Sequence, residues 1–556
     1  MKAFARLLEA LVLTPQRNAK LALLRDYFAR TPDPDRGWAL ASIAGTLDLR
    51  HVTGAPLRVL AEARVDPVLF RMSYDYVGDL AETIALIWPA RGELGPDLRL
   101  SDVVETLKGL SREATVPQIE RWLDRLDASE RLALIKLATG GMRVGVSERL
   151  AKTALAQMLA PEGHDETLTQ IEEMWHGLEP PYVSLFAWLD GREPPPQVDL
   201  RLAFRPMMLA HPLDNALYSA DERKAGLHED EGSEPRTLGR VAERLDPDDF
   251  AAEWKWDGIR VQAISLDGER RLYTRVGEEI GGAFPDVIER MAFEGVADGE
   301  LLVGRAGEGG VEIAPFADLQ KRLGRKNPGA KTLREAPGHV RLYDILNDGS
   351  DDVRHLPFGE RRAHLEGWFE RQPILEGVDL SPLVPFATWD ELAAIRATSR
   401  DDGQEGLMLK RLDSAYVGGR PTGPWWKWKR DPLTADCVLM YAQRGHGKRS
   451  SFYSDYTFGA WRGADLTPVG KAYSGFTDEE LVRLDKWVRD NTTDRYGPVR
   501  AVRHGLVLEI SFDAVQRSTR HKSGIAMRFP RVKRIRWDKP IHEADRLETL
   551  EAMIPA

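Results

Sequence analysis

The chain has 556 residues, of which 42% are hydrophobic and 29% charged, with a formal net charge of -10 at pH 7. This length exceeds that of an ordinary single domain, so we expect three domains, each with its own core. One cysteine, Cys437, excludes an internal disulfide and a four-cysteine zinc site, and no stretch approaches the roughly 20 continuous apolar residues of a membrane span, so we expect a soluble, intracellular protein.

Residues 1 to about 190 show helical periodicity almost throughout. The opening segment, MKAFARLLEALVLT, has apolar residues at helical spacing with Arg6 and Glu9 between them. It therefore predicts the first helix of a domain and not a signal peptide. We expect an all-α N-terminal domain over residues 1–205.

An unusual turn, GGMRVGVS (140–147), separates two of the predicted helices. Three glycines, Gly140, Gly141 and Gly145, surround Arg143, and Ser147 is placed to cap the next helix. Glycines let backbone amides approach a phosphate, and a capped helix N-terminus favours an anion. From the residues alone, a phosphate-binding turn and an ordinary helix–helix turn both remain open.

Short predicted strands and helices follow from about residue 250, which indicates an α+β domain over residues 206–431. The predicted strands are IRVQAISL (259–266), RRLYTRV (270–276), ADGELLV (297–303), HVRLYDIL (339–346) and GLMLKRL (406–412), and the predicted helix is FGERRAHLEGWFERQ (358–372).

The last part, residues 432–556, is strand-rich with one predicted helix, TDEELVRLDKWVRDN (477–491), which begins with a capping box. Such a module is typical of an OB-type β-barrel, a fold that binds oligonucleotides. It also contains a basic cluster in which Asp538 is the only acidic residue between positions 517 and 539. The basic residues are Arg517, Arg520, Lys522, Arg528, Arg531, Lys533, Arg534, Arg536 and Lys539. A solvated basic face and a phosphate-binding surface are both compatible with this pattern.

Lys255 stands between two tryptophans in EWKWDGIR (253–260). The alternation predicts a strand that runs into an Asp-Gly turn and pairs in a hairpin with IRVQAIS (259–265). A free lysine amine has a pKa of about 10.4, so a nucleophilic lysine must be desolvated or near other cations. Arg260, Lys427 and Lys429 are candidates for those cations, and the alternative is a simple surface hairpin.

Further charged and aromatic residues follow downstream of Lys255 in a specific order. They are Arg275, Glu300, Tyr343, Glu405, Lys427 and Lys429 in WWKWKRD, and Arg536, Asp538 and Lys539 in RIRWDKP. With the K-x-D-G motif at 255–258, this order resembles the nucleotidyltransferase superfamily of ATP-dependent DNA ligases and mRNA-capping enzymes. GGMRVGVS lies where the helical DNA-binding domain of larger ATP-dependent DNA ligases has its Gly-rich, Arg-containing turn, so the resemblance covers nearly the whole chain.

The resemblance implies that Lys255 attacks the α-phosphate of ATP and holds AMP, which passes to the 5′-phosphate at a DNA nick before the 3′-hydroxyl displaces it. It implies one role for each matched residue. Glu300 and Glu405 would bind Mg²⁺, with Mn²⁺ as an alternative, or ribose hydroxyls. Around the nucleotide, Lys427 and Lys429 would meet the α-phosphate, Arg260 and Arg275 would hold ribose and phosphate, Tyr343 would stack on adenine, and Glu253 would contact the base edge mainly through its backbone. Arg536, Asp538 and Lys539 would orient pyrophosphate, and Gly140, Gly141, Arg143 and Gly145 would contact DNA.

The implied partner is nicked double-stranded DNA, around which a monomer would close in a bacterial or archaeal cytoplasm, near the nucleoid.

Three alternative functions compete with that of an ATP-dependent DNA ligase. An RNA ligase or mRNA-capping enzyme would share the lysine chemistry but would not explain the helical first third. An NAD⁺-dependent ligase would normally carry a four-cysteine zinc module, which one cysteine cannot build. A non-catalytic nucleic-acid-binding scaffold would not need acidic and basic residues in every motif.

Overall fold

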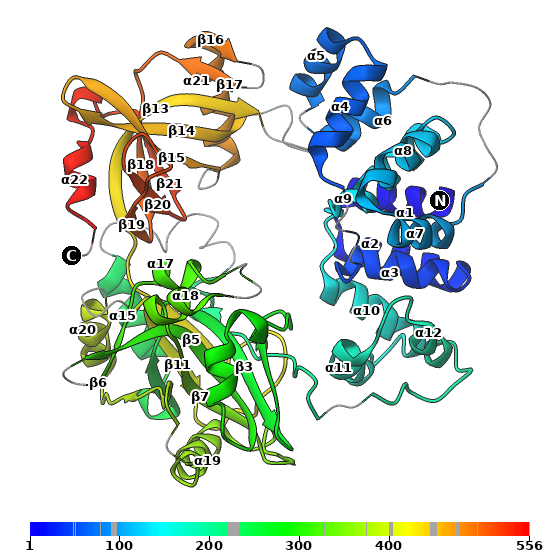
Figure 1. The fold of residues 1–556 in the computed structure, drawn as a ribbon. Helices are drawn as coiled ribbons and strands as arrows, with labels where there is room; N and C mark the ends of the chain where they lie inside the picture. Colours follow the sequence, from blue (N-terminus) through cyan, green and yellow to red (C-terminus); the bar gives the residue numbers. More distant parts are fainter. Residues whose placement is uncertain are drawn as a thin grey trace. The chain divides into compact units, whose positions relative to one another are not determined.

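The computed structural model describes residues 1–47, 49, 52–77, 79–89, 97–198, 201–219, 233–307, 310–323, 325, 328–373, 375–399, 404–444, 453–473, 477–496 and 499–554. Internal contacts divide the chain into two compact units. The first unit is Met1–Ala154 with Pro180–Val183 and Asp431–Ala556, and the second is Leu155–Glu179 with Ser184–Arg430. The three-domain boundaries at 205 and 431 stay a prediction. Figure 1 shows the elements coloured along the sequence.

Helices form the N-terminal part of the first unit, as predicted. The first helix buries the apolar face that its periodicity indicated, with Leu11 fully enclosed. The helix before the glycine-rich turn begins with a capping box between Asp127 and Glu130. The helices are α1 (Lys2–Leu13), α2 (Arg17–Arg30), α3 (Asp35–Ala44), α4 (Gly54–Arg64), α5 (Pro67–Val77), α6 (Leu80–Ile87), α7 (Leu100–Gly109), α8 (Arg112–Leu123), α9 (Ala128–Thr139) and α10 (Glu148–Leu159), the last of which runs into the second unit.

The second unit contains two sheets and the helices that cover them. The strand order of one sheet is β1-β12-β11-β2-β10, and that of the other is β4-β3-β5-β7-β8, with β6 on β5 and β9 on β7. The strands of the first sheet are β1 (His211–Pro212), β2 (Phe250–Trp254), β10 (Leu383–Val384), β11 (Gly406–Arg411) and β12 (Trp425–Lys429). Those of the second are β3 (Ile259–Leu266), β4 (Glu269–Thr274), β5 (Gly295–Gly307), β6 (Gly310–Ile313), β7 (Gly338–Asp348), β8 (Asp351–Asp352) and β9 (Val378–Leu380).

Each sheet buries one face against helices, and a third apolar cluster joins the sheets. Trp368 of the helix FGERRAHLEGWFE packs in the core of the second sheet, and Leu392 packs in that of the first. Ile264 and Trp425, one from each sheet, share the joining cluster. The helices are α11 (Asp165–Met174), η1 (Trp175–Gly177), α12 (Val183–Leu189), α13 (Asp214–Leu217), α15 (Ser233–Arg244), η2 (Pro247–Asp249), η3 (Gly281–Ala283), α16 (Pro285–Arg290), α17 (Phe316–Gln320), α18 (Ala330–Glu335), α19 (Phe358–Glu370) and α20 (Trp389–Thr398).

The five predicted strands of this region are confirmed, but the predicted hairpin at EWKWDGIR is wrong. β2 pairs with β11 and β10, whereas β3 pairs with β4 and β5, so the chain passes from one sheet to the other at Asp257 and Gly258. A Cβ atom at Gly258 would lie 2.5 Å from the carbonyl oxygen of Leu301 on β5. The Asp-Gly pair is therefore a crossing between sheets, and only glycine passes β5 this closely.

The C-terminal part of the first unit is a β-rich, OB-type module, in agreement with the sequence. Its helix α21 has the predicted capping box between Thr477 and Glu480. Cys437 is fully buried in the core, where burial raises the pKa of its thiol. The elements are β13 (Leu433–Arg444), β14 (Tyr453–Arg462), β15 (Asp465–Ala472), α21 (Asp478–Asp490), β16 (Thr492–Tyr496), β17 (Val499–Val502), β18 (Val507–Phe512), β19 (Ala514–Arg517), β20 (Ile525–Arg528), β21 (Arg531–Arg536), η5 (Ile541–Glu543) and α22 (Leu547–Glu551).

Across the described ranges, no helix combines the length and apolar character that a membrane crossing needs.

Candidate active site

Lys255 follows directly on β2, at the edge where β2 meets β11. Its backbone amide donates to the carbonyl of Gly406, and its carbonyl accepts from the amide of Glu405, both at 2.8 Å. Its ammonium forms an ion pair with the Glu405 carboxylate, and its side chain is 23% exposed. The start of β11 therefore fixes both the backbone and the side chain of Lys255, while the side chain stays partly exposed.

The two tryptophans anchor the chain on either side of Lys255. Trp254 points away from Lys255, as alternation predicted, and packs against the core under the first sheet. The Trp256 indole N–H donates to the Ser381 hydroxyl at 3.0 Å, and the Arg341 guanidinium lies 4.3 Å from its ring centroid. This cation–π contact and the hydrogen bond hold the residue after the lysine in place.

Lys427 and Lys429 on β12 lie beside Lys255, as predicted. The ammonium of Lys429 is 3.8 Å from the Glu405 carboxylate, and Lys427 occupies the next position on the same face of the strand. Burial and neighbouring cations lower the pKa of Lys427; the cations are Arg420, Lys429, Lys255 and Arg275. Cations gathered this closely favour a bound anion such as a polyphosphate.

Arg420 belongs to this cationic group, although it was not predicted. It is exposed and lies in the Gly- and Pro-rich segment that leads into β12. Burial, together with Arg420 and Arg260, lowers the pKa of Arg275 just beyond β4. The predicted Arg275 thus meets the predicted Lys427 at the same site.

Glu300 on β5 faces the same group of charges. Burial raises its pKa to about 7; Lys255 and Arg260 oppose this shift, whereas Glu405 reinforces it. Across the part of the chain that the structure describes, no group of three or more His, Cys, Asp or Glu side chains is placed to hold a metal ion. The two carboxylates still fit Mg²⁺, which commonly binds one or two carboxylates and takes its other ligands from phosphate and water.

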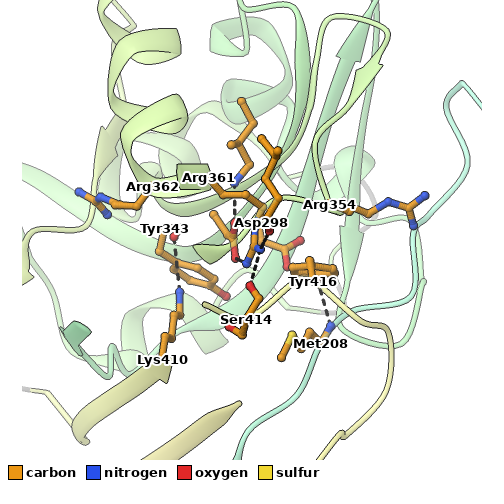
Figure 2. A network of polar contacts seen from close by, with 12 residues as sticks. Met208, Asp298, Tyr343, Arg354, Arg361, Arg362, Lys410, Ser414 and Tyr416 are labelled. Carbon is orange, nitrogen blue, oxygen red and sulfur yellow. Dashed lines mark hydrogen bonds and ion pairs between the residues drawn. The ribbon is translucent and has the colours of Figure 1, made fainter. Parts of the chain in front are cut away.

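Arg260 on β3 is held in a buried polar network. Figure 2 labels three other members of this network, Met208, Asp298 and Tyr416. Its guanidinium donates to the Asp298 carboxylate at 2.7 Å and to the carbonyl of Met208. The Tyr416 hydroxyl donates to the same carboxylate and accepts from the Met208 amide at 3.1 Å. Gln262 completes the set by donating to Asp298 at 3.2 Å. One carboxylate oxygen of Asp298 therefore accepts from Arg260 and Tyr416, and the other accepts from Gln262, so the network fixes the carboxylate that orients Arg260.

The segment before the first sheet is part of this network. The Gln262 side chain accepts from the amide of Arg205 at 2.6 Å and donates to its carbonyl at 3.1 Å. Farther on, the amide of Leu213 donates to the carbonyl of Lys427 at 3.0 Å. Residues 201–213, here called the connector, thus hydrogen-bond to the strands that carry Arg260 and Lys427.

Tyr343 on β7, the predicted stacking residue, lies between two cations. The Lys410 ammonium is 4.7 Å and the Arg260 guanidinium 5.7 Å from its ring centroid. Lys410 also forms a 2.7 Å ion pair with Glu253, and both side chains are almost fully buried. The Glu253 carboxylate is therefore engaged within the protein, and Trp425 packs on the same ammonium.

A second buried ion pair supports the loop that carries Tyr416. Arg361 of α19 donates to both oxygens of Asp344, at 2.9 and 3.1 Å, and both residues are fully buried. The same guanidinium donates to the carbonyl of Ser414 at 2.8 Å, as Figure 2 shows. Removing one partner would leave an uncompensated buried charge.

The RIRWDKP residues lie in the first unit, on and after β21. Arg536 pairs with Asp538 at 2.9 Å, and Lys539 pairs with Asp436 at 2.6 Å. Asp436, at the start of β13, also accepts from Arg536 at 3.4 Å. These three predicted residues form one charged group around a carboxylate that sequence reasoning missed.

Part of the basic cluster is neutralised by acidic residues from neighbouring strands. Glu509 on β18 pairs with Lys533 at 2.9 Å and with Arg534 at 3.1 Å. Asp513 lies 3.7 Å from Arg531. The cluster is therefore not one uniform cationic surface.

The glycine-rich turn joins α9 to α10, as predicted. Gly140 and Gly145 have φ values of 69° and 67°, in the left-handed region that glycine tolerates without strain. Ser147 caps α10 by accepting from the amide of Leu150 at 3.2 Å. Arg143 is exposed.

The residues that sequence reasoning missed are Arg420, Lys410, Asp298, Tyr416 and Asp436. Two of them carried a signal, because Asp298 directly precedes Gly299 and Glu300, and Lys410 ends the segment that follows Glu405. The others take part through pairings that the sequence does not reveal.

Comparisons with known proteins agree with this arrangement. The family model described as "DNA ligase N terminus" matches residues 1–156, "ATP dependent DNA ligase domain" matches 235–429, and "ATP dependent DNA ligase C terminal region" matches 449–539. A "Probable DNA ligase" of Koribacter versatilis (strain Ellin345) is 31% identical over 99% of this chain and 96% of its own length. "DNA ligase 1" of Korarchaeum cryptofilum (strain OPF8) is 29% identical over 99% of this chain and 97% of its own length.

A solved structure titled "Pmar-Lig_PreS3" shares the fold, with a TM-score of 0.59 and 16% identity over 96% of this chain and 99% of that chain. A helical N-terminal region, a β-rich nucleotidyltransferase domain and an OB-type module define a multidomain nucleotidyltransferase. The chain belongs to the family of ATP-dependent DNA ligases.

Proposed function

We propose that this ligase seals nicks in duplex DNA through a lysyl-AMP intermediate at Lys255. The observation that supports this most directly is the partly exposed Lys255 side chain, whose ammonium pairs with Glu405, lies near Glu300 and belongs to a group with four further cations. A family member that uses ATP and acts on DNA needs a nucleophile at such an anion site.

In the first step, the Lys255 amine forms a bond to the α-phosphorus of ATP, and the bond between that phosphorus and the β-phosphate oxygen breaks. Pyrophosphate leaves, and AMP stays on the lysine as a phosphoramidate. The ammonium, which pairs with Glu405, must first lose a proton to solvent, and the loss of that ion pair would free the Glu405 carboxylate. Lys427, Lys429, Arg420 and Arg275 lower the barrier by neutralising phosphate charge, since phosphoryl transfer depends mainly on positioning and electrostatics.

In the later steps, the AMP moves to the 5′-phosphate at the nick, and the 3′-hydroxyl then displaces it and closes the strand. Arg260, fixed by Asp298 and Tyr416, would hold ribose and phosphate, and Tyr343 would present its face to adenine. Glu253 would meet the base edge through its backbone, because its carboxylate is engaged by Lys410.

Glu300 and Glu405 are the residues that would hold Mg²⁺, or Mn²⁺ in its place. The ion would supply charge neutralisation at the phosphates. Because the pKa of Glu300 is raised, part of this carboxyl is protonated near neutral pH, and binding of the ion would displace that proton.

The remaining proposals concern DNA and domains. Gly140, Gly141, Arg143 and Gly145 would contact a DNA phosphate, and Arg536, Asp538 and Lys539 would orient pyrophosphate. The domains would be 1–205, 206–431 and 432–556, closing as a monomer around nicked double-stranded DNA. Relatives in bacteria and archaea support a cytoplasmic enzyme that works at the nucleoid.

The experiment is an intact-mass measurement of the protein before and after incubation with ATP and Mg²⁺, with Lys255→Ala alongside. Protein is first treated with pyrophosphate to remove any bound AMP. The expected result is a gain of one AMP that the variant lacks and that nicked DNA discharges. Nick sealing by Lys255→Ala at the wild-type rate, or discharge by 5′-diphosphate RNA and not by nicked DNA, would overturn the proposal.

A further inference from the structure

Lys20 of α2 is a buried lysine whose partner is the glycine-rich turn. Only 9% of the residue is exposed. Its ammonium donates to the carbonyl of Gly145 at 2.6 Å and lies 3.4 Å from the carbonyl of Val144. These two oxygens lie more than 120 residues further along the chain, so α2 is tied directly to the far end of the turn.

The two bonds dictate which way the neighbouring amides face. A trans peptide places its C=O and the next N–H on opposite sides of the same plane. Because the carbonyls of Val144 and Gly145 point toward Lys20, the N–H groups of Gly145 and Val146 point away from it, to the outer side of the turn.

Those two amides have no acceptor within the described part of the chain, whereas the amides just before them are used inside the turn. Arg143 donates to the carbonyl of Gly141 at 2.8 Å, and Val144 donates to that of Met142 at 3.1 Å. Outward-facing successive amides form a concavity for an anion, and this one leads into the capped first turn of α10.

Gly145 is required by the same arrangement. Its φ of 67° lies in the left-handed region, and a Cβ atom there would lie 2.5 Å from the Lys20 ammonium nitrogen. Lys20 thus occupies the space that a side chain at position 145 would need.

We propose that Lys20 is a positioning residue for DNA binding, which draws two carbonyls inward so that the amides of Gly145 and Val146 face a DNA phosphate beside Arg143. This inference rests on the proposed role of the turn in contacting DNA. Lys20 itself does not touch the phosphate, because its ammonium lies beneath the turn.

The test measures the affinity of the full-length adenylated protein for a nicked duplex at several salt concentrations. The variants are Lys20→Met, the conservative Lys20→Arg, Arg143→Ala and the control Arg17→Met, which removes one charge from an exposed position of the same helix. Self-adenylation without DNA, measured by intact mass, reports whether each variant retains a working second unit.

We expect Lys20→Met to bind about 10-fold more weakly, with no change in the slope of log affinity against log salt concentration (the salt slope). Lys20→Arg should recover most of the affinity, and Arg17→Met should match the wild type. Arg143→Ala should weaken binding and reduce the slope by about one phosphate contact. A Lys20→Met/Arg143→Ala double variant should lose less than the sum of the two single effects, since both act on one phosphate.

Additive losses, or equal affinities for Lys20→Met and Arg17→Met, would overturn the inference. A Lys20→Met slope reduced by about one contact would also overturn it, because Lys20 would then neutralise a phosphate itself. If Arg143→Ala changes neither affinity nor slope, the proposed role of the turn fails instead. Should Lys20→Met not fold, Gly145→Ala tests the same geometry with Lys20 present, and wild-type DNA affinity for that variant would contradict the inference.

Discussion

The proposed adenylation site in the second unit and the glycine-rich turn in the first both carry positive groups, but they are built differently. In the second unit, charged side chains are oriented by carboxylate partners: the buried Asp298 holds Arg260, and the partly buried Glu405 holds Lys255. In the turn, the groups that face outward are backbone amides and the exposed Arg143.

The difference fits the role that we propose for each region. Covalent transfer needs reacting atoms within a narrow range of positions, and buried hydrogen bonds supply that order. Contact with the DNA backbone needs only charge and N–H groups at the right spacing. We therefore expect the first site to respond strongly to small changes and the turn to respond weakly and in a salt-dependent way.

Among variants that keep Lys255, Glu300→Gln gives the largest expected effect, a loss of about 100-fold or more in the rate of self-adenylation, because it removes one of the two carboxylates proposed for Mg²⁺. In the wild-type protein, the pKa of Glu300 is raised to about 7, so the charged form is lost as pH falls through 7. The rate at limiting Mg²⁺ should fall over that window.

Raising the Mg²⁺ concentration should move this midpoint to lower pH, since the ion competes with the proton. Single-turnover kinetics with intact-mass detection would measure both effects, with Lys331→Ala as a control for an exposed charge change in the same unit. If the midpoint of the pH dependence stays the same at all Mg²⁺ concentrations, Glu300 does not bind the metal ion.

Tyr416→Phe should have an intermediate effect, about 10-fold on self-adenylation, because it removes a single oxygen that bonds to Asp298 and to the Met208 amide. The ring and its packing against Trp425 remain. Steady-state kinetics in ATP would show whether the loss is in kcat, as expected for misplacement of Arg260. A wild-type rate would mean that Asp298 and the Met208 carbonyl orient the guanidinium without the tyrosine hydroxyl.

Arg143→Ala should have the smallest effect on chemistry. Nicked-DNA affinity should fall several-fold, and the dependence of log affinity on log salt should flatten by about one contact, while self-adenylation stays normal. Fluorescence anisotropy over a salt series would measure this. A loss of self-adenylation in this variant would contradict the division between the two regions.

Much of the fold was predictable because local patterns decide it. Helical periodicity, the Thr477 capping box and the strand IRVQAISL all reappear where the sequence places them. The hairpin at EWKWDGIR failed because an Asp-Gly pair between strands signals a bend and does not specify the partner. Here the bend crosses to another sheet, with Gly258 against β5.

The candidate site was predictable where a motif keeps its residues close in sequence, as with Lys427 and Lys429. Arg420 and Tyr416 were not predicted because their roles arise from contacts with residues distant in sequence. The hydrogen bond between Tyr416 and Met208, for example, joins residues 208 positions apart. The sequence left the role of the basic cluster open for the same reason, since Glu509 on β18, which neutralises two of its members, lies on a neighbouring strand. Charge pairing between strands is a property of the sheet register and not of composition.

The positions of the contact partners along the chain also set the order in which the regions can mature during synthesis. The contacts of Lys20 with the turn need nothing beyond Gly145, so the turn can form while the second unit is still being translated. The network around Arg260 must wait for Tyr416, and the cationic group must wait for Lys429. A nascent chain would therefore acquire its DNA-contact geometry well before it could hold a nucleotide.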